Sequence, residues 1–305
     1  MIPGTQSPPA RPEPDGTFRP AAGLRLLTWP ALTVLALGGT GADAAVTARA
    51  GGVSDGPYAT LNLSLSVGDD PARVLENRRR LAAALGVSLD DFVFARQVHG
   101  AGVGVVTGAD RGSGAYSLDD AVGDVDALVT ATPGVMLAIL TADCLPVVLH
   151  DPVAGVLACV HAGWRGTVAG VTAAAVAAMG ELGSRPADVV AGLGPAIAGD
   201  RYQVGPDVHE AVTGTFGAPA AGFLRPDLRP GARPDRWVLD LPAANRHALR
   251  EAGVPGAQIH ATPAVTGPPV TGPADSGGFF SDRAARPCGR LALIARLPEP
   301  MDVTT

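Results

Sequence analysis

Short apolar runs, punctuated by Gly, Pro and Asp, recur through most of the chain. Runs of this kind between turn-forming residues predict buried strands, whereas longer stretches with apolar residues three and four apart predict helices. The strands predicted in this way cover residues 45–49, 92–94, 103–106, 126–130, 135–140, 147–149, 156–160, 189–193 and 291–297. The turn residues Asp151-Pro152 and Ala154-Gly155 favour a hairpin between the strands at 147–149 and 156–160.

Helices are predicted where capping residues precede apolar residues at helical spacing. Asp70 and Pro71 provide an acidic N-cap and a first-turn proline, and Gly86 provides the matching stop signal. Further helices are predicted at residues 166–179, after Gly205-Pro206-Asp207, and at residues 240–252.

Segments rich in Pro and Gly separate these elements and divide the chain. They predict loops at residues 51–58 and 262–275, a mobile loop at 108–123, and a surface insertion or linker at 217–236. Residues 1–24 are expected to form a disordered Pro-rich tail and residues 299–305 a second tail, which leaves one domain at 25–298. The apolar stretch 24–37 is interrupted by Pro30, so it predicts early strands rather than a signal peptide or membrane span. The mixture of short strands and helices predicts an α+β, or mixed α/β, fold.

Composition limits the functions that this fold can carry. With 305 residues, 47% hydrophobic and 17% charged, the chain is long and apolar enough to bury a large core as a soluble globular protein. The net charge of −6 argues against general nucleic-acid binding, and an aromatic content of 4% leaves few rings for stacking on bases. No membrane partner is expected.

The basic residues narrow the chemistry further, because all 23 are arginine and the chain contains no lysine. A Schiff-base lysine and a P-loop lysine are therefore excluded, and with them pyridoxal-phosphate chemistry and Walker-type ATP binding. The three cysteines (Cys144, Cys159 and Cys288) are too few and too scattered for a disulfide framework. A reducing, cytoplasmic location is the simpler expectation.

Two histidines and one cysteine form a candidate metal site. His99, Cys144 and His161 each lie beside a predicted strand, next to Gly, Pro or Asp, where loops on a rigid scaffold commonly carry sites. Two imidazoles and one thiol leave one coordination position open, which suits a catalytic zinc rather than a structural one. The spacing of the three residues along the chain does not by itself indicate a metal site. Each histidine alone could be a hydrogen-bonded core residue, and the cysteine alone could be a small buried residue.

Several motifs occur together in the same order along the chain. They are Arg49-Ala-Gly-Gly-Val-Ser54, Pro57-Tyr-Ala-Thr-Leu-Asn62-Leu63, Gln97-Val-His99-Gly100, Thr141-Ala-Asp143-Cys144, His161-Ala-Gly-Trp164-Arg165-Gly166 and Phe279-Phe-Ser-Asp-Arg283. In combination the chain resembles the laccase-domain family, the YfiH/YlmD group, whose members are called polyphenol oxidases or purine nucleoside phosphorylases. The resemblance covers about residues 28–297 and implies a compact YfiH-like fold of stacked mixed β-sheets flanked by helices.

The resemblance also implies a metal centre and an activity. His99, Cys144 and His161 match the ligands of the family, which usually hold zinc, and copper is less expected. The implied activities are phosphorolysis of adenosine, inosine, guanosine and methylthioadenosine, and deamination of adenosine. Purine nucleosides and phosphate are thus the expected partners, and the sequence is compatible with a monomer or a dimer.

Residues for this chemistry can be assigned on the matching motifs. The expected catalytic residues are Asp143, Cys144 and Arg165, and the expected substrate- or phosphate-binding residues are Arg49, Asn62, Arg165 and Arg283. A guanidinium group donates two parallel hydrogen bonds to phosphate, although a surface ion pair is the ordinary alternative for each arginine. Asp143 is expected to act as general base or to hold a ligand histidine in its tautomer, and a turn-capping carboxylate is the alternative.

Two other functions stay open at this point. A copper-dependent phenol oxidase would use two histidines and a cysteine, but the six histidines of the chain lack the His-x-His pairs of a multicopper oxidase. A non-catalytic nucleoside-binding protein is suggested by two departures from the family pattern. His260 stands where a cysteine-threonine pair is common, and Ala284 replaces the second arginine after Phe279-Phe280-Ser281.

Overall fold

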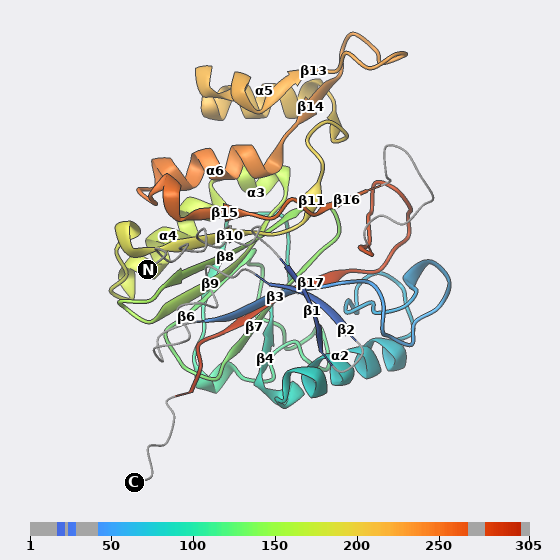
Figure 1. Ribbon diagram of the computed structural model, residues 1–305, viewed down its shortest axis with the longest axis vertical. Coiled ribbons are helices and arrows are strands. Elements are labelled where there is room, and N and C mark those ends of the chain that lie inside the picture. The colour runs from blue at the N-terminus through green and yellow to red at the C-terminus, as the bar shows by residue number, and fades with distance from the viewer. Residues whose placement is uncertain (1–16, 22–23, 29–41, 268–277, 300–305) are drawn as a thin grey trace, which may run out of the picture.

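Two six-stranded sheets pack face to face at the centre of the fold (Figure 1). The structure is a computed structural model that describes residues 17–21, 24–28, 42–267 and 278–299. In spatial order, the first sheet contains β1 (Thr17–Ala21), β2 (Leu24–Thr28), β3 (Asp43–Thr47), β17 (Leu291–Arg296), β7 (Met136–Thr141) and β4 (Phe92–Phe94). The second contains β15 (Ile259–Ala261), β10 (Val190–Leu193), β8 (Leu145–Asp151), β9 (Val156–Ala162), β6 (Ala127–Thr130) and β5 (Val103–Val105).

Both sheets are mixed, as the predicted α+β, mixed α/β fold requires. The pairs β4–β7, β5–β6 and β10–β15 are parallel, and the other neighbouring strands of the two sheets are antiparallel. Burial on both faces explains why the strands appear in the sequence as nearly unbroken apolar runs. On β9, for example, Leu157 and Cys159 face the first sheet, while Ala158 and Val160 belong to the core shared with the helices.

Helices cover the outer faces of the two sheets (Figure 1). On the first sheet lies α2 (Pro71–Leu85), whose Leu81 packs with Phe92 and Phe94 of β4. The helices on the side of the second sheet are α3 (Trp164–Val168), α4 (Val171–Glu181), α5 (Pro206–Phe216) and α6 (Leu241–Glu251). Short 3-10 helices occupy Gly56–Tyr58, Leu89–Asp91, Gly108–Asp110, Pro186–Asp188, Ala218–Gly222 and Gly256–Gln258. Among the described residues, no helix combines the length and the apolar composition that crossing a bilayer requires.

The capping signals locate the first helix correctly. The Asp70 side chain accepts a hydrogen bond from the Ala72 amide at 2.9 Å, and Gly86 ends α2 with a φ of 69°. The predicted helix at residues 166–179 is instead two helices, because the chain passes through Gly170 at a φ of 83° between α3 and α4. The short α3 thus begins one residue beyond β9, with Gly163 between them.

Residues 217–236 are more ordered than a linker. They include β13 (Leu224–Pro226), which pairs with β14 (Trp237–Leu239) in a three-stranded sheet completed by β12 (Gln203–Val204). Ala220, Phe223 and Leu224 are buried in the same core as the second sheet and its helices, so this segment packs into the domain. The segment predicted as a loop at 262–275 contains β16 (Val265–Thr266), which pairs in parallel with β11 (Ala196–Ile197).

Two predicted boundaries shift. The antiparallel pair β1–β2 places Thr17–Ala21 in a sheet, so ordered chain begins within the expected tail at residues 1–24. The expected mobile loop at 108–123 is anchored at its centre, where Ala115 is fully buried and the Arg78 side chain donates to the carbonyls of Gly114 and Ala115. Residues 1–16, 29–37 of the predicted early strands, 268–275 of the loop at 262–275, and 300–305 of the second tail lie outside the described residues.

Candidate metal centre and substrate pocket

Three segments bring the predicted metal ligands together. His99 follows β4, Cys144 immediately precedes β8, and His161 lies near the end of β9. The register of the β8–β9 hairpin pairs Leu145 with Ala162 and so sets Cys144 beside His161. The candidate ligand atoms of the three side chains all lie within 4.8 Å of one another, and the two imidazole rings meet edge to face at a centroid distance of 4.7 Å. The predicted trio is therefore a real cluster.

The cluster has the donors and the space that a small divalent metal needs. One thiolate and two imidazoles are ligands of both zinc and copper, and three protein ligands leave room for a further one. Gly163 lies against the cluster, where an added β-carbon would come within 3.0 Å of the Cys144 sulfur and 3.1 Å of His99 Cδ2. A side chain at this position would meet the ligands closely enough that they would have to shift, and the donor set itself fits a metal.

Charge within the cluster favours the thiolate. Burial alone would raise the pKa of Cys144, but the His161 and His99 imidazoles outweigh this effect and lower the pKa of the thiol. Burial alone would likewise lower the pKa of His161, yet the Cys144 thiolate and a hydrogen bond to Asp126 raise it. A metal ion would take the place of the imidazolium proton as the partner of the thiolate.

Asp126 is a residue of the cluster's surroundings that no sequence motif singled out. Its fully buried carboxylate lies 2.7 Å from Nδ1 of His161, the kind of contact that was expected of Asp143. The available signal was a carboxylate at the first position of the buried strand predicted at 126–130. Burying a carboxylate without a hydrogen-bonding partner costs free energy, so a partner for Asp126 was to be expected.

Asp143 performs a different task. Its Oδ1 accepts a hydrogen bond from Thr266 at 2.5 Å, and its Oδ2 accepts from the Ser281 hydroxyl at 3.0 Å and the Arg283 amide at 2.6 Å. The residue has a φ of 84° in the turn between β7 and β8. Both carboxylate oxygens are engaged, so Asp143 ties β16 and the segment of Arg283 to the turn that carries Cys144.

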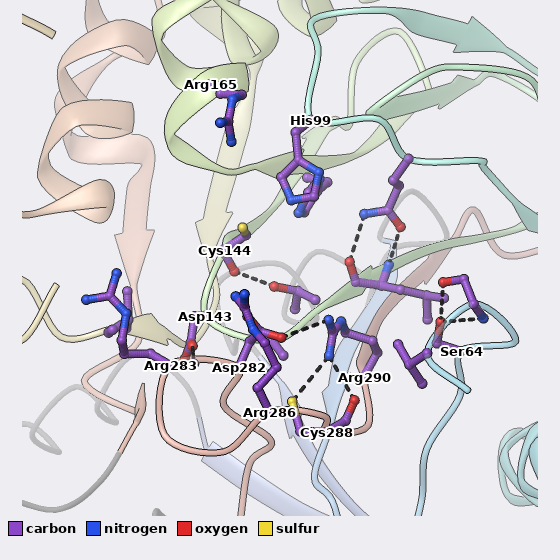
Figure 2. Close-up of a pocket in the computed structure, with 18 of the residues that line it drawn as sticks. Ser64, His99, Asp143, Cys144, Arg165, Asp282, Arg283, Arg286, Cys288 and Arg290 are labelled. Carbon is purple, nitrogen blue, oxygen red and sulfur yellow. Dashed lines mark hydrogen bonds and ion pairs between the residues drawn. The ribbon is translucent and has the colours of Figure 1, made fainter. Parts of the chain in front are cut away.

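A pocket of about 780 Å³ opens over the metal cluster (Figure 2). Five arginines line it: Arg96, Arg165, Arg283, Arg286 and Arg290. In the view of Figure 2, Arg165 and His99 lie on one side of the pocket, and Arg283, Arg286 and Arg290 lie on the other. An arginine-rich pocket in an acidic protein is suited to an anionic ligand.

Two of these arginines are stacked on aromatic rings of the same pocket. The Arg165 guanidinium lies 4.4 Å from the ring centre of Trp164, and that of Arg283 lies 5.1 Å from Tyr202. The Arg283 side chain also donates to the carbonyl of Gln203 at 2.9 Å. Stacking restricts the side-chain motion of both arginines and leaves donors free for a ligand.

Two predicted binding residues lie outside the pocket lining. Arg49 donates two hydrogen bonds to the carbonyl of Ala59 and stacks 5.0 Å from the centre of the Phe280 ring. Asn62 is fully buried, where its side chain donates to Asp69 and accepts from the Arg290 amide. Both residues fix the backbone behind the pocket and do not reach into it.

The two departures from the family pattern also lie apart from the metal ligands. His260 is a half-buried residue of β15, outside both the pocket lining and the metal cluster. The exposed Ala284 donates its amide to the Ser281 hydroxyl and likewise does not line the pocket. A fourth ligand from His260 is therefore not part of this site.

The other histidines are scattered through the fold. His150 is buried in β8, His209 stacks on Trp237, and His247 lies against Phe216 and Phe223. Within residues 17–21, 24–28, 42–267 and 278–299, His99, Cys144 and His161 form the single group of three or more such side chains close enough to share a metal. The described residues thus provide one candidate site for a single metal ion.

Comparison with known proteins gives a consistent family. The family model described as multi-copper polyphenol oxidoreductase laccase matches residues 43–297. A purine nucleoside phosphorylase from Deinococcus radiodurans is 46% identical over 228 residues, which is 75% of this chain and 82% of that protein. The purine nucleoside phosphorylase YlmD from Geobacillus stearothermophilus is 39% identical over 269 residues, which is 85% of this chain and 92% of that one.

The comparison of folds agrees with the comparison of sequences. The crystal structure of the hypothetical protein YfiH from Bacillus licheniformis superposes with a TM-score of 0.81 at 32% sequence identity. The superposition covers 92% of this chain and 98% of that one. The match therefore extends through both sheets and the helices around them.

Proposed function

The chain belongs to the laccase family described as multi-copper polyphenol oxidoreductase laccase, and we propose that it is a zinc-containing purine nucleoside phosphorylase. The observation that carries this proposal is the single His99, Cys144 and His161 cluster opening into an arginine-lined pocket. Relatives named purine nucleoside phosphorylase support the reaction class. We propose adenosine, inosine, guanosine and methylthioadenosine as its substrates.

Phosphate binding is assigned to Arg165 and Arg283. Arg286 and Arg290 share the carboxylate of Asp282, whereas no carboxylate in the described part of the chain pairs with Arg165 or Arg283. Their guanidinium groups can therefore give their hydrogen bonds to an oxyanion. Asp143 contributes indirectly, because it holds the backbone of Arg283 in place.

The nucleoside is assigned to the apolar part of the same pocket. Trp164, Tyr202, Ile197 and Leu241 provide rings and aliphatic surface for a purine and a sugar. Small-molecule pockets commonly have volumes of roughly 300 to 1,000 Å³. The volume of this pocket, about 780 Å³, lies within that range. A nucleoside and a phosphate ion can thus lie side by side.

The proposed reaction exchanges one bond at the anomeric carbon. A phosphate oxygen bonds to C1′ as the bond from C1′ to the purine nitrogen breaks, and the bond electrons leave with the base, which then takes up a proton. The arginines orient the phosphate and balance its charge. The products are the free purine and ribose 1-phosphate, or 5-methylthioribose 1-phosphate when methylthioadenosine is the substrate.

We also propose adenosine deamination at the metal. His99, Cys144 and His161 would hold the zinc, which would supply hydroxide near neutral pH. In the net reaction, water adds at C6 of adenosine, ammonia leaves and inosine remains. The protein contributes the thiolate, the fixed imidazoles and a pocket wall that positions the base.

All three cysteines are free, which supports our placement of the enzyme in the reducing cytoplasm.

The test is a turnover panel on pure, zinc-loaded protein. Each nucleoside is incubated with phosphate, and chromatography measures free base, ribose 1-phosphate and inosine. We expect phosphate-dependent release of base; absence of both base and inosine would overturn the proposal. A His161→Ala variant, expected to lose its zinc by elemental analysis, provides the matched control.

Phenol oxidation is the second candidate, favoured by the family description and by the two-histidine, one-cysteine donor set. Oxygen uptake with a phenol is measured on copper-loaded and zinc-loaded protein. Uptake with copper and no nucleoside turnover with either metal would favour this candidate. Nucleoside binding without turnover in calorimetry would instead indicate a non-catalytic binding protein.

A further inference from the structure

Asp126 connects the two segments that carry the ligand histidines. It stands directly before β6 and has no solvent-exposed surface. Its backbone carbonyl accepts a hydrogen bond from the His161 amide at 2.7 Å, and its own amide donates to Gly102 at 2.9 Å. Asp126 is thus held between β9 and the loop that follows His99.

The side chain of Asp126 fixes the imidazole of His161. Oδ1 lies 2.7 Å from Nδ1 of His161. Both oxygens of Asp126 already accept backbone amides, so the carboxylate acts as an acceptor throughout. Nδ1 of His161 therefore donates its hydrogen to Oδ1, which leaves Nε2 as the atom available to a metal.

The same carboxylate fixes the backbone around His99. It accepts three consecutive amides: Val98 at 3.2 Å and Gly100 at 2.6 Å on Oδ2, and His99 at 3.0 Å on Oδ1. His99 has a φ of 60°, a left-handed conformation that a histidine adopts at a cost in energy. The three hydrogen bonds to Asp126 offset this cost and direct the imidazole toward Cys144.

We propose that Asp126 is the positioning residue of the metal centre, holding both imidazoles in ligand geometry through one carboxylate. With the Cys144 thiolate it also supplies two negative charges against a divalent cation. The proposal rests on the metal centre of the proposed function but not on its substrate. Metal binding therefore tests it even if the nucleoside assignment fails.

The experiment measures metal affinity of full-length Asp126→Asn protein by competition with a chromophoric chelator for zinc. We expect the affinity to fall by about 10- to 100-fold, as is usual when an outer partner of a ligand histidine is lost. Cobalt-loaded protein should show a changed visible spectrum, because the ligand geometry changes. Wild-type affinity and an unchanged cobalt spectrum would overturn the proposal.

A matched control exists at the other end of the β8–β9 hairpin. Asp151 is also fully buried and accepts from the amides of Val153, Ala154 and Arg185 and from the Ser184 hydroxyl, but it touches no metal ligand. Asp151→Asn should lower thermal stability while keeping wild-type zinc affinity. An equal loss of affinity in both variants would show that Asp126 acts only through stability and would also overturn the proposal.

A measurement on wild-type protein covers the case in which Asp126→Asn does not fold. Heteronuclear NMR of the imidazole nitrogens in cadmium-loaded protein reports which nitrogen binds the metal. We expect the metal on Nε2 and the proton on Nδ1 of His161. Metal bound to Nδ1 would contradict the role of Asp126.

Discussion

Gly163 lies so close to Cys144 that a β-carbon on the glycine would stand 3.0 Å from the thiol sulfur. The same atom would stand 3.1 Å from Cδ2 of His99, so the turn from β9 into α3 passes directly over two of the three ligands. In Gly163→Ala we therefore expect the ligands to be pushed apart and zinc affinity to fall about tenfold or more. Chelator competition measures the change.

Gly214 provides the control for this substitution. It lies within α5, and an added β-carbon would meet nothing within 4 Å. Gly214→Ala should keep wild-type zinc affinity and raise stability by up to about 1 kcal/mol, since alanine favours the helix. Unchanged zinc affinity in Gly163→Ala would show that the cluster tolerates the added methyl group.

Arg165 should contribute mainly to phosphate binding. It lines the pocket and is stacked on Trp164, without a carboxylate partner in the described part of the chain. Arg165→Gln is expected to raise the KM for phosphate by about 10- to 100-fold, because a charged hydrogen bond to phosphate is lost. The effect on the KM for the nucleoside should be smaller. Arg185→Gln, which removes an exposed partner of Asp188 on the surface, is the control and should leave both constants unchanged.

His150 should make stability depend on pH. It is fully buried, both ring nitrogens lack a hydrogen-bond partner within the described structure, and burial lowers its pKa from 6.5 to about 4. The unfolded chain takes up a proton below pH 6.5 while the folded protein resists protonation until about pH 4. Stability therefore falls as the pH falls through this window, by about 2 kcal/mol between pH 7 and pH 5.

Denaturant unfolding at pH 7 and pH 5 measures this dependence. His150→Leu and His150→Gln both remove the titrating group, so each should lose about the same part of the pH dependence. The difference between wild type and variant isolates His150 from the other titrating groups. Identical pH dependence in all three proteins would contradict the assignment.

Arg78 should be critical for stability. It is buried in α2 and donates to the carbonyls of Leu63, Gly114 and Ala115, with its guanidinium 4.0 Å from the ring centre of Phe94. Arg78→Met leaves these carbonyls without their donor and should cost about 3 kcal/mol or more in the free energy of unfolding. It should also expose the segment 108–123 to protease.

The next residue along the helix is the control. Arg79 is exposed on α2, so Arg79→Met should change the free energy of unfolding by less than about 0.5 kcal/mol. Equal stability of the two variants would show that the backbone around Gly114 does not depend on Arg78.

Local signals predicted the strands and helices because those signals act within a few residues. The Asp70 cap and the Gly86 stop define α2, and the apolar runs define β6 to β10. The break at Gly170 was missed because a glycine within a helical stretch is compatible with either one helix or two. The left-handed φ of 83° at Gly170 makes it two helices, and glycine adopts this conformation without steric cost.

The parts of the candidate site that follow from residue type could be predicted from the sequence. The parts that follow from contacts between residues far apart in the chain could not. His99, Cys144 and His161 were found from their chemistry and their positions beside strands. Asp126 was not, since its bond to His161 joins residues 35 positions apart. Arg49 carries the right charge for phosphate, but its hydrogen bonds to Ala59 keep it behind the pocket wall.

The place of β17 has a consequence for biosynthesis. This strand comes from residues 291–296 yet lies between β3 and β7 in the middle of its sheet. As the chain leaves the ribosome, β3 and β7 are made long before the strand that joins them. Their facing edges stay unpaired until then, and unpaired edges attract other chains. The first sheet can therefore close only after residues 291–296 have been synthesised.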